Sequence, residues 1–275
     1  MTIDWVGPPS GHWPASVGVV CTTRRGRGAV AGHSQGPYAY LNLATHVGDE
    51  PHAVTANRQI LVASTGVERV QWLDQVHGRR CIEASSQTAA LVPEADAAWT
   101  SERGLGLAVL TADCVPVVIC DRAGSLVAVA HAGWRGLVGG VLTSVVDALT
   151  GVADALTGVA DALTGVADAL PAAPTELLAW IGPAIGPEAY EVGEEVVAAV
   201  AALGDGGPLS RACVRPGPKP GKYQLDLFTL SERLLQQAGV PVVHCERLCT
   251  HSDPRFYSYR RDSVTGRMAT LAWLR

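Results

Sequence analysis

The sequence has little positive charge and no run of basic residues. Its 21 lysines and arginines are outnumbered by 26 aspartates and glutamates, which gives a formal net charge of -5 over 275 residues. The cationic residues are scattered along the chain. A nucleic-acid partner requires a basic surface, which this composition does not supply. We therefore expect no nucleic-acid partner and favour a protein that acts on small molecules.

Targeting and membrane-spanning segments are also missing from the sequence. Residues 1–16 have neither a positively charged n-region nor an apolar h-region. No apolar stretch is long and uniform enough to span a bilayer. We expect a cytoplasmic protein without a membrane partner. Seven cysteines are an odd number for a chain of this length, so we expect no disulfide framework and treat single thiols as packing, metal-binding or reactive groups.

What the sequence does contain is an alternation of short apolar runs and helical patterns, which predicts an α/β fold. With 48% hydrophobic residues, the chain can bury a sizeable core. We expect residues 1–275 to form a single domain of mixed sheets flanked by helices. The expected strands lie at 17–23, 70–73, 105–110, 115–120, 126–130, 177–181, 240–243 and 268–273. The expected helices lie at 51–65 and 191–203, after Gly133, and before Ala238. The first of these places Asn57 and Arg58 on its polar side.

A tandem repeat extends one of these helical patterns between residues 147 and 170. It reads DALTGVA three times and then DAL, with leucine and valine alternating at intervals of three and four residues. This heptad seam predicts an extended helix inserted in the domain, although each glycine costs about 1 kcal/mol relative to alanine. We interpret the repeat as a scaffold that ends before Pro171. It either projects from the domain or pairs by its seam with a second copy in a homodimer.

Three candidate metal ligands follow predicted strands. His77 comes after 70–73, Cys114 after 105–110 and His131 after 126–130. Ligands at the ends of different strands can converge at one edge of a sheet. One thiolate and two imidazoles are a zinc set that leaves a fourth position open, where zinc can activate water near neutral pH. We predict that the three bind one metal, although their separations of 37 and 17 residues are not a specific signature.

Other chemistries remain open for the same residues. Two histidines and one cysteine also resemble a blue-copper set, which takes a weak axial methionine. The methionines are Met1 and Met268, and no His-x-His pair occurs among the eight histidines, so copper is the less favoured metal. A metal-free Cys114 nucleophile with histidine as its base would indicate a hydrolase or amidase. A non-catalytic interaction protein using the repeat helix is a further alternative.

Seven segments carry a family resemblance. In order along the chain they are NLATHVGDEPHAVTANR, WLDQVHG, ADAAWT, LTADCVPV, HAGWRG, IGPAIGPEAYEVGEEV and FYSYRRDSVTGRMATLAWL. Together they resemble the YfiH or laccase-domain family, long labelled multicopper polyphenol oxidases, over nearly the whole chain from Val17. The resemblance implies one α/β domain with a zinc held by His77, Cys114 and His131. The loop 24–36, RRGRGAVAGHSQG, departs from the Arg-x-Gly-Gly-Val-Ser pattern of the family.

The same resemblance implies an activity. The family is associated with purine nucleoside phosphorylase activity on adenosine, inosine, guanosine and methylthioadenosine, with adenosine deaminase activity alongside. Purine nucleoside and phosphate are then the expected partners. Some members are described as peptidoglycan-editing factors, which matches the Cys-His amidase alternative, and the older label matches a copper-dependent polyphenol oxidase. The combined cytidine-deaminase signature of H-x-E with P-C-x-x-C is absent, because no P-C-x-x-C occurs in the sequence.

Polar residues beside these motifs are candidates for catalysis and substrate binding. Asp113, next to Cys114, can orient a ligand or move a proton, and buried pairing with backbone is an equal alternative. The helix N-terminus at HAGWRG, together with Arg135 of that motif, is the candidate phosphate cradle. Arg260 and Arg261 are alternatives, because a guanidinium fork suits phosphate, unless they form surface ion pairs. The remaining substrate-binding candidates are Asn42, His46, Arg58 and Gln75.

Overall fold

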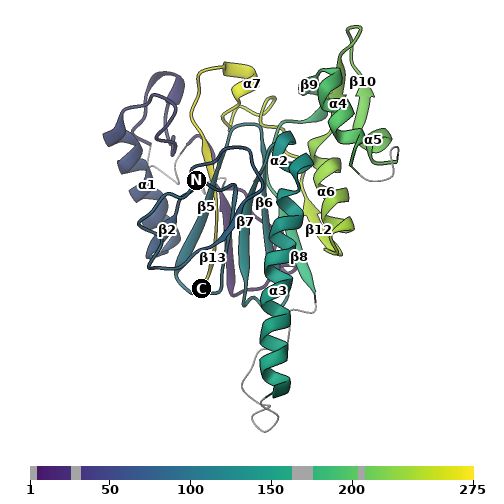
Figure 1. The fold of residues 1–275 in the computed structure, drawn as a ribbon. Coiled ribbons are helices and arrows are strands. Elements are labelled where there is room, and N and C mark those ends of the chain that lie inside the picture. Colours follow the sequence, from purple (N-terminus) through teal and green to yellow (C-terminus); the bar gives the residue numbers. More distant parts are fainter. Residues whose placement is uncertain (1–4, 26–31, 163–175, 204–207) are drawn as a thin grey trace.

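The computed structural model describes residues 5–25, 32–162, 176–203 and 208–275. Within these ranges the fold is α/β, with mixed sheets flanked by helices, as predicted (Figure 1). Its strands are β1 (Val17–Cys21), β2 (Arg69–Gln71), β3 (Cys81–Glu83), β4 (Ala97–Thr100), β5 (Leu105–Thr111), β6 (Val115–Asp121), β7 (Val127–Ala132), β8 (Leu177–Ile181), β9 (Glu191–Val192), β10 (Val214–Pro216), β11 (Tyr223–Leu225), β12 (Val242–Cys245) and β13 (Met268–Leu274). Its helices are η1 (Gly36–Tyr38), α1 (Pro51–Thr65), α2 (Trp134–Gly139), α3 (Val141–Ala162), η2 (Pro187–Ala189), α4 (Glu194–Ala201), α5 (Pro208–Cys213), α6 (Leu227–Gln237) and α7 (Tyr259–Asp262).

The strands form two large sheets and one small sheet. One large sheet has the order β12-β8-β6-β7-β4-β3, the other has the order β1-β13-β5-β2, and β10-β11-β9 form the small one. Strand β6 is antiparallel to both β7 and β8, whereas β3 runs parallel to β4. Strand β5 belongs to the four-stranded sheet and β6 to the six-stranded sheet. The turn that carries Cys114 therefore crosses from one large sheet to the other.

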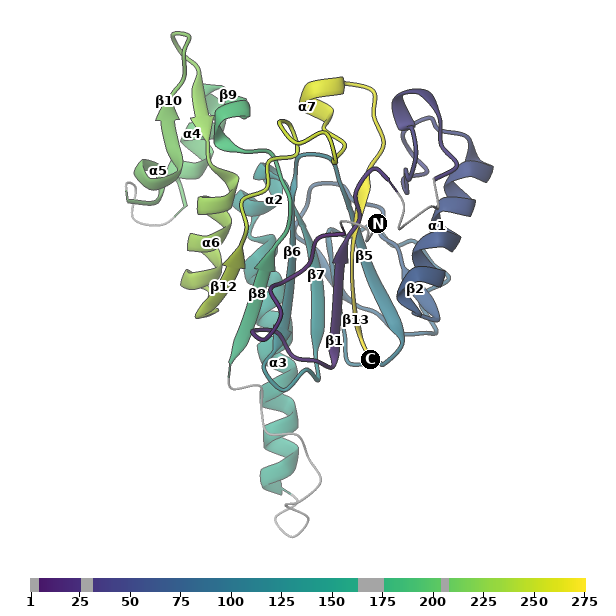
Figure 2. The same ribbon diagram turned by 180° about the vertical axis from the view of Figure 1, so that it is seen from behind.

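The two large sheets are stacked, with helices on both outer faces (Figures 1 and 2). Helix α1 covers the four-stranded sheet, and helices α2, α3 and α6 cover the six-stranded sheet. Side chains of β6 alternate between the layers: Val117 and Ile119 meet the helices, and Val118 and Cys120 meet the other sheet. A strand buried on both faces reads as a continuous apolar run, which is why this stretch shows no polar alternation.

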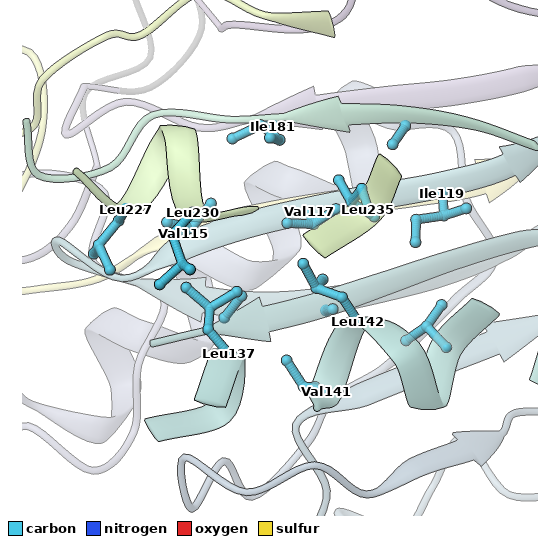
Figure 3. Packing of buried hydrophobic residues seen from close by; sticks show 14 of the residues in the cluster. Val115, Val117, Ile119, Leu137, Val141, Leu142, Ile181, Leu227, Leu230 and Leu235 are labelled. Atoms are coloured by element: carbon cyan, nitrogen blue, oxygen red, sulfur yellow. The ribbon is translucent and has the colours of Figure 1, made fainter. Parts of the chain in front are cut away.

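The core on the helical side joins residues that lie far apart in the sequence. Val117 and Ile119 of β6 pack with Leu142 of α3 and with Leu230 and Leu235 of α6 (Figure 3). Each of these side chains is at least 99% buried. Full burial of such a side chain contributes about 1.5–3 kcal/mol, so this cluster holds the helices firmly against the sheet.

Helix α1 has the predicted bounds, but Asn57 is not on its polar side. Asn57 is fully buried, and its amide donates to the Ser34 hydroxyl and to the backbone carbonyls of Tyr40 and Asn42. The prediction was wrong because the loop before α1 folds over the helix and brings backbone groups that must be satisfied. An apolar side chain at this position would leave those groups without a partner.

Three predicted boundaries also need correction. The single helix expected after Gly133 is divided into α2 and α3 by Gly140, whose φ of 88° ends α2 in a left-handed cap. The helix predicted at 191–203 begins only at Glu194, because 191–192 form β9 and pair with β11. Strand β7 continues to Ala132, so His131 lies within the strand and not after it.

Helix α3 packs on the domain along its first turns. Val145, Val146 and Leu149 are buried in the core, and Val152 packs against its margin. The helix then continues beyond the ends of the sheets (Figure 1). Residues 163–170 of the repeat lie outside the described residues, so the insertion and the homodimer through its seam stay predictions. No helix in the described ranges is both long and apolar enough to cross a membrane.

We expect removal of residues 147–160 to leave the domain folded. Because the repeat is exact, the deletion puts DALTGVADAL directly after Val146, and leucine and valine again occupy the positions of Leu149 and Val152. The midpoint of thermal unfolding should move by no more than about 2–4 °C, which corresponds to roughly 1 kcal/mol. As a control, Leu149→Ala should lose about 2–5 kcal/mol. Loss of folding on deletion would show that the repeat belongs to the core.

Candidate metal centre

The structure brings His77, Cys114 and His131 together at one end of the six-stranded sheet. One potential ligand atom from each lies within 4.8 Å of the others, and the two imidazole rings meet edge to face with centroids 4.7 Å apart. His131 is buried, Cys114 is half-buried and His77 is exposed. In the described part of the chain this is the only such cluster of three histidine, cysteine or carboxylate ligands. It opens to solvent on the His77 side.

Strand pairing explains this convergence. Pro116 of β6 pairs with His131 of β7, so Cys114, just before β6, lies beside the end of β7. On the other side of β7, Ala97 of β4 pairs with Ala130. Strand β3 is parallel to β4 and begins at this same edge, which brings the preceding His77 to the group.

Asp96, which the sequence analysis missed, holds the cluster together. Its fully buried carboxylate accepts hydrogen bonds from the backbone N–H groups of Val76 (3.2 Å), His77 (2.9 Å) and Gly78 (2.6 Å), and from His131 Nδ1 (2.8 Å). The last bond leaves Nε2 of His131 for a metal, an arrangement common for metal-binding histidines. An ionisable residue directly before the buried strand in ADAAWT is the sequence signal for this role.

Charges in the group favour the thiolate form of Cys114 and the protonated form of His131, which must lose a proton when it binds a metal. Burial alone would raise the pKa of Cys114, but the charge of His131 and the hydrogen bonds from both histidines outweigh it and lower that pKa. Burial likewise acts to lower the pKa of His131, but the thiolate and Asp96 raise it. Burial also opposes ionisation of Asp96, yet its hydrogen bonds keep its pKa below the ordinary value. The thiolate, which is the metal-binding form of cysteine, is therefore favoured at neutral pH.

The backbone around the cluster is shaped for close approach. A Cβ added to Gly133 would lie 3.0 Å from Cys114 Sγ and 3.1 Å from His77 Cδ2, so a larger residue there would have to displace these two candidate ligands by a few tenths of an ångström. His77 has a φ of 59°, a left-handed conformation that costs a non-glycine residue about 1–3 kcal/mol. The bond from its own N–H to Asp96 helps to hold that conformation.

The donor set fits zinc. Zinc bonds of about 2.0–2.3 Å in a tetrahedral site put the ligand atoms roughly 3.3–3.8 Å apart. The separations here, all within 4.8 Å, reach that range with small side-chain movements. One thiolate and two imidazoles are borderline-soft ligands that zinc accepts, and the exposed side of the group leaves space for a further ligand.

Asp113 lies outside this cluster, although it is adjacent to Cys114 in the sequence. Its carboxylate is only 8% exposed and accepts hydrogen bonds from Thr250 Oγ1 (2.7 Å) and from the backbone N–H of Arg260 (2.6 Å). Its φ is 97°, so its backbone is strained. Both carboxylate oxygens are thus engaged by the protein, which is the buried pairing weighed as its alternative role.

Three predicted substrate-binding side chains are occupied by protein contacts. Asn42 is fully buried, and its amide bonds to backbone groups and to the carboxylate of Asp49. Gln75 pairs with both the N–H and the carbonyl of Leu110. Arg261 donates to three backbone carbonyls and to an adjacent carboxylate. These contacts favour a structural role for all three.

The other four candidates have more available side chains. His46 is exposed; desolvation and the charge of Arg267 lower its pKa, so it is neutral near pH 7. Arg58 is half-buried over the ring of Trp72, and burial lowers its pKa to about 10. Arg135 is exposed and lies over Trp134, on an α2 of only six residues, so it has little helix dipole behind it. The fourth, Arg260, donates to the carbonyl of residue 191 and lies over a tyrosine ring.

Arg267 is a further candidate that the sequence analysis missed. It is half-buried, and burial lowers its pKa while the nearby thiolate of Cys114 acts to raise it. One guanidinium nitrogen donates to the carbonyls of Thr265 and Gly266. Within the described residues its other N–H groups meet no acceptor. A partly desolvated guanidinium with free donors near the cluster is well suited to bind an anion.

Comparison with known proteins finds relatives along nearly the whole chain. A family model described as "Multi-copper polyphenol oxidoreductase laccase" matches residues 18–275. A purine nucleoside phosphorylase of Pseudomonas aeruginosa is 43% identical over 273 residues, with 98% of each chain covered. The purine nucleoside phosphorylase YfiH of Escherichia coli is 39% identical, covering 96% of this chain and 97% of the other. A solved Neisseria meningitidis structure matches with a TM-score of 0.83 at 38% identity, covering 99% of each chain.

Substitution of Asp96 should weaken metal binding without removing a ligand. In Asp96→Asn the amide can no longer accept all four hydrogen bonds, so we expect zinc affinity to fall roughly 10–100-fold in competition with a chromophoric chelator. Asp121→Asn is the matched control, because Asp121 is equally buried but bonds only to the 125–126 turn. Equal zinc affinities in the two variants would contradict this role of Asp96.

Proposed function

We propose, from the premise that this chain belongs to the multi-copper polyphenol oxidoreductase laccase family, that it is a zinc-dependent purine nucleoside phosphorylase. Relatives that carry the name purine nucleoside phosphorylase at 39–43% identity over nearly its full length are the main support. The compact His77, Cys114 and His131 group adds a chemical basis. The proposed substrates are phosphate and adenosine, inosine, guanosine or methylthioadenosine, and adenosine deamination is proposed as a second activity.

Zinc suits this chain better than copper. A multicopper oxidase needs several metal positions, and the described residues offer one group of three ligands. A blue-copper site takes an axial methionine. Met268 is fully buried, and its sulfur accepts a hydrogen bond from the backbone N–H of Tyr257, so it is engaged in the core. These observations support a single zinc ion in place of a copper centre.

Phosphorolysis requires an anion site beside the sugar. An oxygen of phosphate forms a bond to C1′ of the ribose, the bond from C1′ to the purine nitrogen breaks, and the base leaves with that electron pair and gains a proton. Arg267 has the free donors to hold the phosphate, and Arg135 supplies a second cation at the margin. His46, neutral near pH 7, offers an imidazole for proton exchange. Zinc, when bound, supplies a Lewis acid with an open coordination position.

Loss of a ligand should abolish activity and metal binding together. We expect Cys114→Ala and His131→Ala to remain folded but to lose phosphate-dependent cleavage of adenosine and inosine, because each removes a zinc ligand. Base and pentose phosphate are resolved by chromatography, and zinc is measured in protein purified without added metal. Cys245→Ala, another half-buried thiol outside the group, is the control and should keep both properties.

The same assays separate the competing functions. Inosine formed from adenosine without phosphate would support the deaminase activity. Phenol oxidation that survives Cys114→Ala, with no nucleoside turnover in the wild type, would overturn the proposal in favour of a laccase-like oxidase. Activity that persists in a metal-free protein but requires Cys114 would indicate a Cys-His hydrolase or amidase, such as a peptidoglycan-editing factor.

Removal of the Arg267 guanidinium should weaken the binding of phosphate more than the binding of nucleoside. A hydrogen bond to a charged group is worth about 1.5–3 kcal/mol, so Arg267→Ala should raise the KM for phosphate roughly 10–100-fold. The KM for nucleoside should change much less. Arg135→Ala, measured beside it, should show a smaller effect of the same kind because its side chain is exposed. Equal changes in both KM values would move the phosphate site elsewhere, with Arg260 next to be tested.

A further inference from the structure

We propose that Asp113 is a positioning residue that fixes the segment 249–262 against the candidate metal centre. It thereby sets the placement of Arg260, a further guanidinium candidate for phosphate binding, beside Tyr190. The inference rests on the proposed function for its kinetic consequence, although the contacts that carry it are independent of any activity. Asp113 is thus assigned a role other than proton transfer.

Asp113 joins three parts of the chain at the turn that carries Cys114. One oxygen of its carboxylate accepts from Thr250 Oγ1 at 2.7 Å, and the other accepts from the backbone N–H of Arg260 at 2.6 Å. Its backbone carbonyl accepts from the N–H of Ile185 at 2.9 Å. The carboxylate and the Thr250 hydroxyl are both buried, so water competes little for these bonds.

The segment held by Asp113 is braced internally. Arg261 donates to the backbone carbonyls of Thr250, His251 and Phe256, which ties the start of the segment to α7. The Ser258 hydroxyl accepts from the N–H of Arg261 and caps α7. A braced segment shifts as a unit, so its attachment to Asp113 affects the position of every side chain it carries.

Arg260 connects this attachment to the site. Its guanidinium donates to the carbonyl of Glu191 at 2.9 Å and lies 5.0 Å from the centre of the Tyr190 ring. Tyr190 is close enough to Cys114 and Arg135 for their charges to act on its phenol group. The direction in which the Arg260 side chain leaves the backbone depends on the bond between its N–H and Asp113. The geometry therefore links a residue next to a proposed metal ligand with the cation that lies over the Tyr190 ring.

Kinetics on zinc-loaded protein test this role. Asp113→Asn keeps the size of the side chain, but its NH₂ group then faces either the Thr250 hydroxyl or the backbone N–H of Arg260, and one of the two hydrogen bonds is lost. Because Arg260 would then be displaced, we expect the KM for phosphate to rise about tenfold. The KM for nucleoside should stay within about twofold and the zinc content should be unchanged. Thr250→Val, which removes one bond only, should give a smaller effect of the same kind, and Thr250→Ser should restore the wild-type value. Zinc loss in Asp113→Asn, equal changes in both KM values, or no rescue by serine would overturn the proposal.

Amide hydrogen exchange gives a readout that needs no activity. In Asp113→Asn, the amides of 259–262 should exchange about tenfold faster than in the wild type, and those of 76–78 should be unaffected. Unchanged exchange at Arg260 would overturn the positioning role. If the wild type cleaves no nucleoside, the proposed function fails, and exchange at Arg260 still decides whether Asp113 holds the segment.

Discussion

The buried carboxylate of Asp96 is the constraint on which the rest of the site depends. It accepts three consecutive backbone N–H groups from 76–78 and the Nδ1 proton of His131. A buried charge persists only when its hydrogen-bonding capacity is filled, and here the partners that fill it are the chain segment and the imidazole that present two of the three candidate ligands. The hydrogen bonds that stabilise the buried Asp96 carboxylate therefore also fix the positions of His77 and His131.

The layered fold makes this arrangement possible. The six-stranded sheet supplies rigid neighbours at fixed spacing: β4, β7 and β6 bring Asp96, His131 and Cys114 to one edge. The turn carrying Cys114 also links this sheet to the four-stranded sheet, so both stacked cores restrain it. A site built on strand ends of a packed sandwich is held more precisely than one built on surface loops.

Charge is distributed unevenly between the site and the rest of the chain. The protein carries a formal net charge of -5, yet Arg58 and Arg267 lie close enough to His46, and Arg135 and Arg260 close enough to Tyr190, for their charges to act on those side chains. Among them, Arg267 is partly desolvated and retains free donors, whereas Arg135 is exposed to solvent. Partial desolvation strengthens an interaction with an anion. The partly buried Arg267 should therefore bind an anion more strongly than the exposed Arg135.

The sequence by itself located eight of the strands, the bounds of α1 and the three residues of the cluster, whereas the short strands β3, β4, β9, β10 and β11 were not predicted from it. Continuous apolar runs and residues able to ligate a metal beside them are local signals, and local signals survive in a single sequence. Tertiary structure decided the rest. Asp96, Arg267 and the buried Asn57 owe their roles to groups brought to them from other segments, and Asp113 acquired its partners from residues 137 and 147 positions away. A polar side chain in a sequence does not disclose its partners, because those partners are fixed only when the sheets stack.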